Sequence, residues 1–184
     1  MLEVEDIWLE RIEKEKPEKK NILVFSKWNF RRAAKKLIWF KDNIAFISIE
    51  NLEECCRYYR EVKGINDWDN DHYLPDGLGV LNIEFDDVAE DDEKEGYHFK
   101  TISQEDADKI VEFIEKNLGK HFIIHCKAGK SRSQGVADFM FQMYPDYFEK
   151  CIENSYNPCI TPNIEVVRKL KRAFFKYHGF EIKD

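Results

Sequence analysis

The sequence lacks a long hydrophobic run: no apolar segment approaches the roughly 18 residues that a membrane-spanning helix needs. Three of residues 1–6 are acidic, and this start contains no apolar block like that of a secretory signal peptide. Internal repeats and low-complexity segments are also absent. We therefore expect a cytoplasmic protein with no membrane span, folded as a single domain over residues 1–184.

Metal-binding patterns are lacking as well. The cysteines number five, and the adjacent pair Cys55-Cys56 does not have the spacing of metal ligands. The five histidines are scattered along the chain. We expect no metal and no cofactor, with free thiols in a reducing compartment. Cys55, Cys56, Cys151 and Cys159 are interpreted as packing residues, and a reversible disulfide between one of them and Cys126 is the alternative.

An excess of positive charge is lacking too. The chain has 29 basic and 36 acidic residues, so its formal net charge is −7. An acidic protein repels nucleic acids and anionic membranes at long range, and neither is an expected partner. The basic run Arg31-Arg32 with Lys35-Lys36 is interpreted as the solvated face of a helix. The expected state is a monomer.

Predicted strands and helices alternate along the chain. Short apolar runs predict strands at 22–25, 45–49, 79–85 and 122–124. Helical spacing and end signals predict helices at 3–16, 28–41, 52–62, 103–118, 131–145, 146–154 and 161–178, the last capped by Thr161. The polar stretches 64–78 and 86–96 predict loops. This alternation predicts an α/β fold, with a mostly parallel central sheet of four or five strands and helices on both faces.

One segment places a cysteine and an arginine between a strand and a helix, and it reads His125-Cys126-Lys127-Ala128-Gly129-Lys130-Ser131-Arg132-Ser133. Backbone amides of such a loop, together with the helix N-terminus, can bind a tetrahedral dianion. The same positive field stabilises a thiolate. Arg132 offers a planar fork for two phosphate oxygens, and Gly129 allows a sharp turn. The alternative is a buried structural cysteine.

This segment resembles the signature loop of the protein tyrosine phosphatase superfamily, His-Cys-x-x-Gly-x-x-Arg-Ser/Thr. It is most similar to the compact dual-specificity-phosphatase-like branch and its small prokaryotic and viral members. The resemblance covers about residues 79–178, whereas residues 1–78, including a helical extension at 1–20, match only in the order of strands and helices. It implies a cysteine-phosphatase fold and hydrolysis of phosphotyrosine, and also of phosphoserine or phosphothreonine, in a protein or peptide.

The resemblance also implies roles for individual residues. Cys126 attacks phosphorus and forms a phosphocysteine intermediate, and Arg132 binds the phosphate and stabilises the transition state. Ser133 donates a hydrogen bond to the departing thiolate, and His125 orients the loop. Asn163 supports the loop or the hydrolytic water, or it is simply a helix-start residue. The phosphate is surrounded by Lys127, Ala128, Gly129, Lys130, Ser131 and Arg132.

The leaving oxygen needs a proton, which calls for a general acid near the loop. The family places an Asp upstream of the cysteine, just after a strand, and Phe85-Asp86-Asp87-Val88 matches that place. Similar members use the second residue of such a pair, so Asp87 is the expected acid. Asp86, Asp91 and Asp92 are the alternatives, because the segment departs from the Trp-Pro-Asp form of the larger tyrosine-specific enzymes.

Three alternatives, two of function and one of fold, are compatible with parts of the sequence. Lys127 and Lys130 resemble the loop lysines of phosphoinositide phosphatases, although both can also point outward. The same chemistry can therefore act on a phosphoinositide or on an RNA 5′ phosphate. A catalytically silent phosphate-binding module is the second alternative. The low-molecular-weight phosphatase fold is the third, but its loop lies near the N-terminus, and here the loop begins at residue 125.

Overall fold

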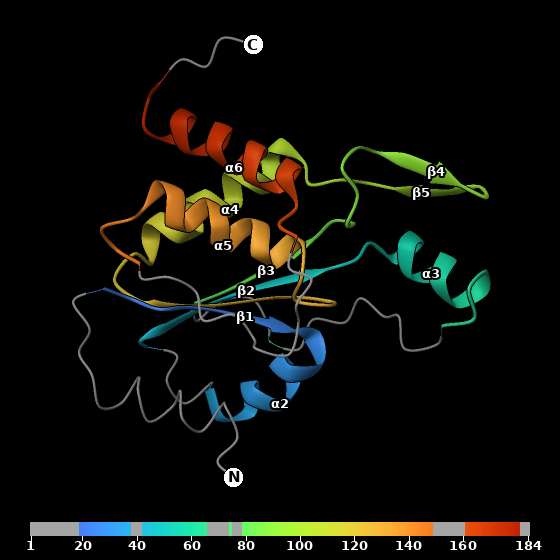
Figure 1. The fold of residues 1–184 in the computed structure, drawn as a ribbon, viewed down its shortest axis with the longest axis horizontal. Helices are drawn as coiled ribbons and strands as arrows, with labels where there is room; N and C mark the ends of the chain where they lie inside the picture. The colour runs from blue at the N-terminus through green and yellow to red at the C-terminus, as the bar shows by residue number, and fades with distance from the viewer. Residues whose placement is uncertain (1–18, 38–41, 66–73, 75–78, 149–160, 181–184) are drawn as a thin grey trace.

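A computed structural model describes residues 19–37, 42–65, 74, 79–148 and 161–180 (Figure 1). Its central sheet has the strand order β1 (Ile22–Ser26), β6 (His121–Cys126), β2 (Ile44–Glu50) and β3 (Val80–Glu84). Every neighbouring pair is parallel. The predicted α/β fold with a parallel sheet of four or five strands is confirmed, and each of its strands was predicted to within two residues.

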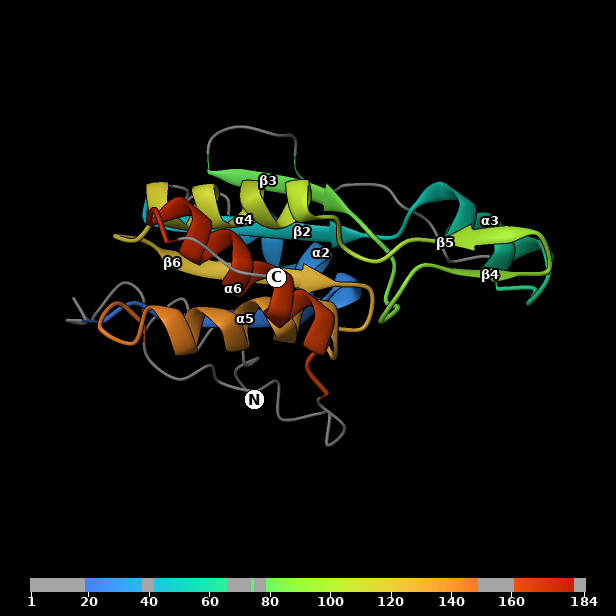
Figure 2. The same cartoon turned by 90° about the horizontal axis from the view of Figure 1, so that it is seen from above.

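Helices cover both faces of this sheet. Helix α2 (Lys27–Leu37) lies on one face, and α4 (Gln104–Lys116), α5 (Arg132–Met143) and α6 (Ile164–Tyr177) lie on the other (Figures 1 and 2). Successive side chains of a strand point to opposite faces, and the core follows that alternation. Ile47 and Ile124 pack under α4, α5 and α6, whereas Phe46 and Ile123 pack against Phe30 of α2.

The helix ends agree with the sequence signals at one helix and differ at another. Ser103 caps α4, because its hydroxyl accepts a hydrogen bond from the backbone N–H of Asp106 at 3.0 Å. Thr161 was predicted to cap the last helix with Pro162 at its first position, and this is wrong. Asn163 is the cap: its Oδ1 accepts from the N–H groups of Glu165 and Val166, and α6 begins at Ile164.

A β-hairpin begins inside a segment that the sequence predicted to be a loop, and it ends in residues 97–99, for which no element was predicted. Strands β4 (Asp92–Lys94) and β5 (Tyr97–Phe99) pair antiparallel. Glu95 and Gly96 join them with φ angles of 53° and 78°, as a tight two-residue turn requires. The loop prediction for 86–96 is therefore wrong at β4. This strand is too polar and too short to show an apolar pattern in the sequence.

Helix α3 (Glu53–Glu61) packs on this hairpin and forms a lobe with it. The ring of Tyr58 contacts those of Tyr97 and Phe99 edge to face, at centroid distances of 5.5 and 5.2 Å. The lobe of α3, β4 and β5 lies beyond the carboxyl ends of the parallel strands (Figures 1 and 2). Ligands of open parallel sheets bind at that edge.

Several predictions fall wholly or partly outside the described residues. These are the helix at 3–16, the end of the helix at 28–41, most of the loop at 64–78, most of the helix at 146–154, and Cys151 and Cys159. In the part of the chain that the structure describes, no helix combines the length and apolar character needed to cross a membrane. The same residues contain no group of histidine, cysteine and carboxylate side chains arranged to hold a metal ion.

Candidate active site

The predicted phosphate-binding loop lies across the carboxyl ends of β1 and β6. Gly129 has φ +69°, and a Cβ atom there would lie 2.7 Å from the backbone carbon of Phe25 and from the nitrogen of Ser26. The N–H of Lys27 donates to the carbonyl of Lys127 at 3.2 Å. Glycine is therefore required at this position for two reasons, which are the positive φ and the close approach of β1.

Cys126 is the last residue of β6 and is 2% exposed. Its Sγ lies 3.1 Å from Oγ of the buried Ser133 in the first turn of α5. Among the described residues no side chain caps α5, and the hydroxyl of Ser131, its N-cap residue, donates to Asp87. The first N–H groups of a helix need partners from outside it, so this helix start can bind an anion.

Arg132 begins α5 and is 2% exposed. Its Nη1 donates to the carbonyl oxygens of Phe85 at 2.7 Å and Glu50 at 3.2 Å. Its buried Nε has no hydrogen-bond partner among the described residues. Leaving a buried donor unpaired costs about 1–3 kcal/mol, more for a charged group, so an anion bound beside Nε would satisfy a donor that the protein leaves open.

The two adjacent aspartates that follow β3 have different environments. Asp87 is exposed, and its Oδ1 accepts hydrogen bonds from Ser131 Oγ at 2.6 Å and Asn163 Nδ2 at 3.0 Å. Asp86 is 1% exposed and accepts from the N–H groups of Leu52 at 3.1 Å and Lys100 at 3.0 Å. Burial raises the pKa of Asp86 above its ordinary value. Asp87 therefore contacts the predicted phosphate-binding loop, whereas Asp86 joins the end of β3 to the backbone that flanks the lobe.

The two remaining candidate acids lie on the hairpin side of the lobe. Asp91 accepts from the N–H of Thr101 at 2.9 Å, and Asp92 forms a 3.0 Å ion pair with Lys94. In the part of the chain described, no hydrogen bond joins either of them to a loop residue. The geometry thus favours Asp87 among the four acids that the sequence left open.

The supporting residues are arranged around the loop as follows. Asn163 caps α6 with Oδ1 and contacts Asp87 with Nδ2, so it serves both as a helix start and as a neighbour of the site. Its N–H donates to the carbonyl of Ser131 at 3.2 Å. His125 is buried, and its ring stacks on Phe30 at 4.0 Å. Lys130 is half-buried, and its carbonyl accepts from the N–H of Thr161.

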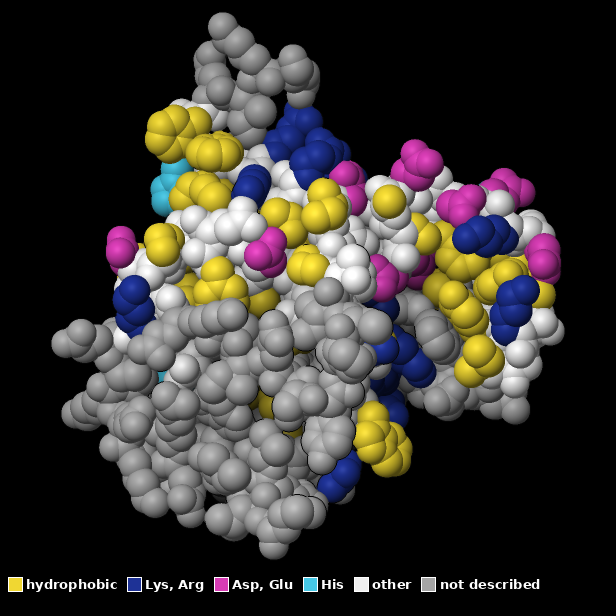
Figure 3. Space-filling view, viewed as in Figure 1, with side chains coloured by type: hydrophobic (Ala, Val, Ile, Leu, Met, Phe, Trp, Pro, Cys, Tyr) yellow, Lys and Arg dark blue, Asp and Glu magenta, His cyan; other side chains and the backbone are white. Residues whose placement is uncertain are grey.

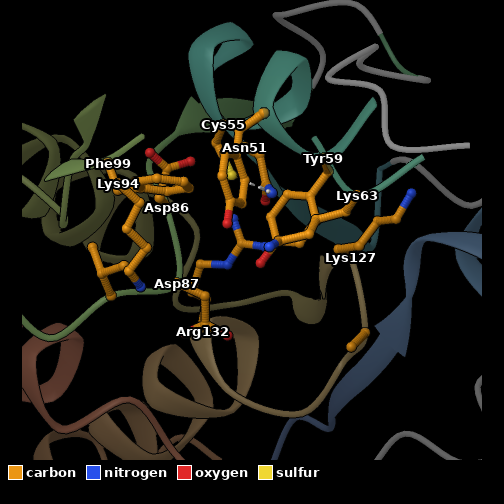
Figure 4. A pocket seen from close by; sticks show the side chains of 13 residues that line it. Asn51, Cys55, Tyr59, Lys63, Asp86, Asp87, Lys94, Phe99, Lys127 and Arg132 are labelled. Carbon is orange, nitrogen blue, oxygen red and sulfur yellow. Dashed lines mark hydrogen bonds between the residues drawn. The ribbon is translucent and has the colours of Figure 1, made fainter. Parts of the chain in front are cut away.

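A pocket of about 330 Å³ lies between the loop and the lobe (Figure 4). Cys126 is not among its lining residues; the pocket reaches the loop through residues that follow this cysteine. In Figure 4, Arg132 extends from the start of α5 toward the α3 side of the pocket. The lining residues come from the loop (Lys127, Ala128, Arg132), the segment after β3 (Asp86, Asp87, Val88), the α3 region (Asn51, Cys55, Tyr58, Tyr59, Lys63) and the hairpin (Lys94, Phe99).

Cys55 and Cys56 are buried, free thiols, which agrees with their interpretation as packing residues. Burial, and secondarily the charge of Asp86, raises the pKa of Cys55 to about 12. Burial likewise raises the pKa of Cys56 to about 11. Since the thiolate is the reactive form, neither is activated as a nucleophile.

Sequence reasoning missed the α3 and hairpin walls and a buried ion pair. The aromatic residues that could have indicated a pocket wall are Tyr58, Tyr59 and Phe99. Their spacing in the sequence does not show that they line the same pocket. Lys27 Nζ lies 2.9 Å from Glu50 Oε2, and these side chains are 5% and 1% exposed. No local pattern marks two residues that are separated by a helix and a strand as partners.

No family model and no curated protein match the chain. Among solved structures, the Yvh1 phosphatase domain from Chaetomium thermophilum aligns with a TM-score of 0.45 and 18% sequence identity, over 92% of this chain and 97% of that chain. PTPMT1 in complex with PI(5)P aligns with a TM-score of 0.41 and 16% identity, over 88% of this chain and 96% of that chain. Both similarities are low, so the function is inferred from the geometry of the site.

Proposed function

We propose that this chain is a cysteine-dependent phosphatase of the protein tyrosine phosphatase superfamily, with the compact dual-specificity-like architecture. The observation that carries the proposal is the contact between Asp87 and Ser131, which sets a carboxyl group against the loop of Cys126 and Arg132. The loop contributes a nucleophile and an anion-binding guanidinium, and the segment after β3 contributes an acid. Each has the residue type that phosphoryl transfer through a thiol needs.

The first step forms a bond between Sγ of Cys126 and phosphorus and breaks the bond from phosphorus to the ester oxygen. The ester oxygen leaves with the electron pair and takes a proton from Asp87. Arg132 binds the equatorial oxygens of the phosphoryl group through Nε, while Nη1 remains on the carbonyls of Phe85 and Glu50.

The second step returns the enzyme to its starting state. Water attacks the phosphocysteine, and the carboxylate of Asp87 takes the proton that the water gives up. The bond from sulfur to phosphorus breaks, and its electron pair stays on Cys126 as a thiolate. Ser133, 3.1 Å away, donates a hydrogen bond to that thiolate. The scheme uses no metal ion, so a chelator should leave the rate unchanged.

The favoured substrate is phosphotyrosine in a protein or peptide. The pocket is walled by Tyr58, Tyr59, Val88 and Phe99, which offer apolar and aromatic surface to a phenyl ring. Phosphoserine and phosphothreonine carry the same phosphate without a ring to fill that space. They are therefore proposed as weaker substrates.

Hydrolysis of p-nitrophenyl phosphate by the wild-type chain and by Cys126→Ser tests the chemistry. The wild type should turn over and be inhibited by vanadate, and the serine variant should lose turnover while it still binds phosphate. If the folded wild type binds phosphate without hydrolysing the ester, the chain is a silent binding module. Substantial turnover by Cys126→Ser would remove Cys126 from the mechanism.

A further inference from the structure

The walls of the pocket carry more positive charge than the rest of the molecule. Its lining includes the cations Lys63, Lys94, Lys127 and Arg132 and the two carboxylates Asp86 and Asp87, although the whole chain has a net charge of −7. Figure 3 shows lysine and arginine side chains gathered in the hollow between the sheet-bearing body and the lobe. The net positive lining therefore attracts an anionic ligand to this hollow.

Two of these lysines lie on aromatic rings of the lobe. Lys63 Nζ lies 5.2 Å from the ring centroid of Tyr58, and Lys94 Nζ lies 5.6 Å from that of Phe99. Such cation–π contacts hold the ammonium groups at the pocket wall while leaving their other faces to solvent or ligand. The phosphoryl group belongs at Arg132, so a second negative group can pair with Lys63, or with Lys94 in competition with Asp92.

The lysines stand on different sides of the phosphate site. In Figure 4, Lys94 lies on one side of Arg132, and Lys63 and Lys127 lie on the other. An extended peptide that inserts a phosphotyrosine between them would place its preceding and following residues toward opposite lysines. A compact polyphosphorylated ring would instead need cations that converge on one place, and it offers no aromatic face to Tyr59 or Phe99.

We propose that Lys63 and Lys94 form acidic-residue subsites on the two sides of the phosphotyrosine, so that the preferred substrate is a phosphotyrosine peptide with Asp or Glu flanking the modified residue. This inference rests on the proposed function. Asp92 limits the second subsite, because it pairs with Lys94 at 3.0 Å. Removing that carboxylate should strengthen the subsite.

The test compares phosphotyrosine peptides that carry Glu on both sides, on the amino side only, on the carboxyl side only, or Gln on both sides. The ratio of kcat/KM for the Glu-flanked and Gln-flanked peptides should be about threefold to tenfold in the wild type at low salt, and should fall toward one at high salt. In Lys63→Gln/Lys94→Gln the ratio should be close to one. Asp92→Asn should raise it.

Lys63→Gln should lose the preference for Glu on one side of the phosphotyrosine and keep it on the other. Lys94→Gln should show the opposite pattern. Lys116→Gln is the matched control, because Lys116 is exposed, pairs with Glu112 on α4 and does not line the pocket. Its ratio should equal that of the wild type. An unchanged ratio in the double variant, or a preference of the wild type for soluble inositol polyphosphates over all four peptides, overturns the inference.

The same peptides separate this inference from the proposed function. Their affinities for Cys126→Ser are measured by calorimetry, which needs no turnover. A Glu preference in binding, lost in the double lysine variant, supports the subsites even if the wild type fails to hydrolyse p-nitrophenyl phosphate. Turnover of that ester with equal binding of all four peptides leaves the phosphatase in place and removes the subsites.

Discussion

Lys27 and Glu50 form a buried ion pair, 2.9 Å long, beside the loop proposed to bind phosphate. The backbone N–H of Lys27 donates to the carbonyl of Lys127, and the carbonyl of Glu50 accepts from Nη1 of Arg132. One pair of side chains thus joins the ends of β1 and β2 at the points where each touches the loop. We infer that the pair positions the loop and its arginine.

Removing one partner of this pair should be costly. Glu50→Leu leaves the charge of Lys27 buried without its carboxylate, and we expect a loss of about 3–5 kcal/mol in the free energy of unfolding, together with reduced turnover. Replacing both, in Lys27→Met/Glu50→Leu, should recover most of the stability. Urea unfolding measures the stability.

Lys109→Ala is the control for that experiment, because Lys109 pairs with Glu105 on the surface and should change stability by about 0–1 kcal/mol. If Glu50→Leu changes the free energy of unfolding and the turnover as little as Lys109→Ala does, the buried pair does not position the loop.

Gly129→Ala should abolish phosphate binding. The added Cβ would meet backbone atoms of Phe25 and Ser26 at 2.7 Å, and backbone cannot move aside as a flexible side chain does. Gly64→Ala separates this clash from backbone strain, because Gly64 has a similar φ of +68° and nothing within 4 Å of the added atom. Calorimetric phosphate binding should be lost in the first variant and retained in the second. Equal binding by both would place the loop away from β1.

Asp87→Asn should lower kcat by about 100-fold or more and flatten the alkaline limb of the pH–rate profile, because the acid must be protonated to act. The amide keeps an oxygen for the hydrogen bonds from Ser131 and Asn163, so stability should change little. Stopped-flow or steady-state rates from pH 5 to pH 9 provide the measurement. A profile with an intact alkaline limb would identify another residue as the acid.

Asp86→Asn should affect stability more than chemistry. Both carboxylate oxygens of Asp86 accept backbone N–H groups, from Leu52 and Lys100, and an amide replaces one acceptor with a donor. We expect a loss of about 1–3 kcal/mol in the free energy of unfolding. Hydrogen exchange should rise in α3 and the β4–β5 hairpin. Should this variant lose the alkaline limb instead, the acid is Asp86.

Acidification should destabilise the fold through His121. Burial lowers the pKa of His121 from 6.5 to about 4, so the unfolded chain binds a proton in that interval and the folded chain does not. Stability is therefore unaffected by this group above about pH 6.5, and falls by on the order of 2–3 kcal/mol as the pH drops toward 4. Urea midpoints at pH 7 and pH 5 measure this effect.

His121→Asn should reduce the slope between those two pH values, since it keeps an acceptor for the N–H of Asn21 and does not titrate. His98→Asn, at an exposed position of β5, is the control and should keep the wild-type slope. Identical slopes in all three proteins would assign the acid sensitivity to other groups.

The sheet could be predicted from the sequence because its strands are buried on both faces. The runs in β2 and β6 are nearly continuous in apolar residues, and parallel strands covered by helices require that pattern. The loop between β6 and α5 could be located from the sequence because the residues that mark it are consecutive, and its binding of phosphate stays a prediction. Asp87 lies 44 residues before Ser131, and their contact follows from the parallel order of β3, β2 and β6, which brings the segments after these strands to one edge.

The lobe could not be predicted in the same way. All three residues of the strand Asp92–Lys94 are exposed, so it has no buried face to produce an apolar alternation. Its pairing depends on the turn at Glu95-Gly96 and on Tyr58 and Phe99, which meet only after α3 has packed. The Lys27–Glu50 pair was missed because burial of opposite charges depends on the register of three strands.

The two contacts of the Asn163 side chain, with the start of α6 and with Asp87, affect how Asp87 can move. Its Oδ1 belongs to the start of α6, and only its Nδ2 reaches Asp87. If Asp87 swings outward to admit a substrate and back to donate its proton, the amide and the hydroxyl of Ser131 each break one hydrogen bond, and the helix keeps its cap. An outward movement of Asp87 would therefore leave the start of α6 and its backbone hydrogen bond to Ser131 in place.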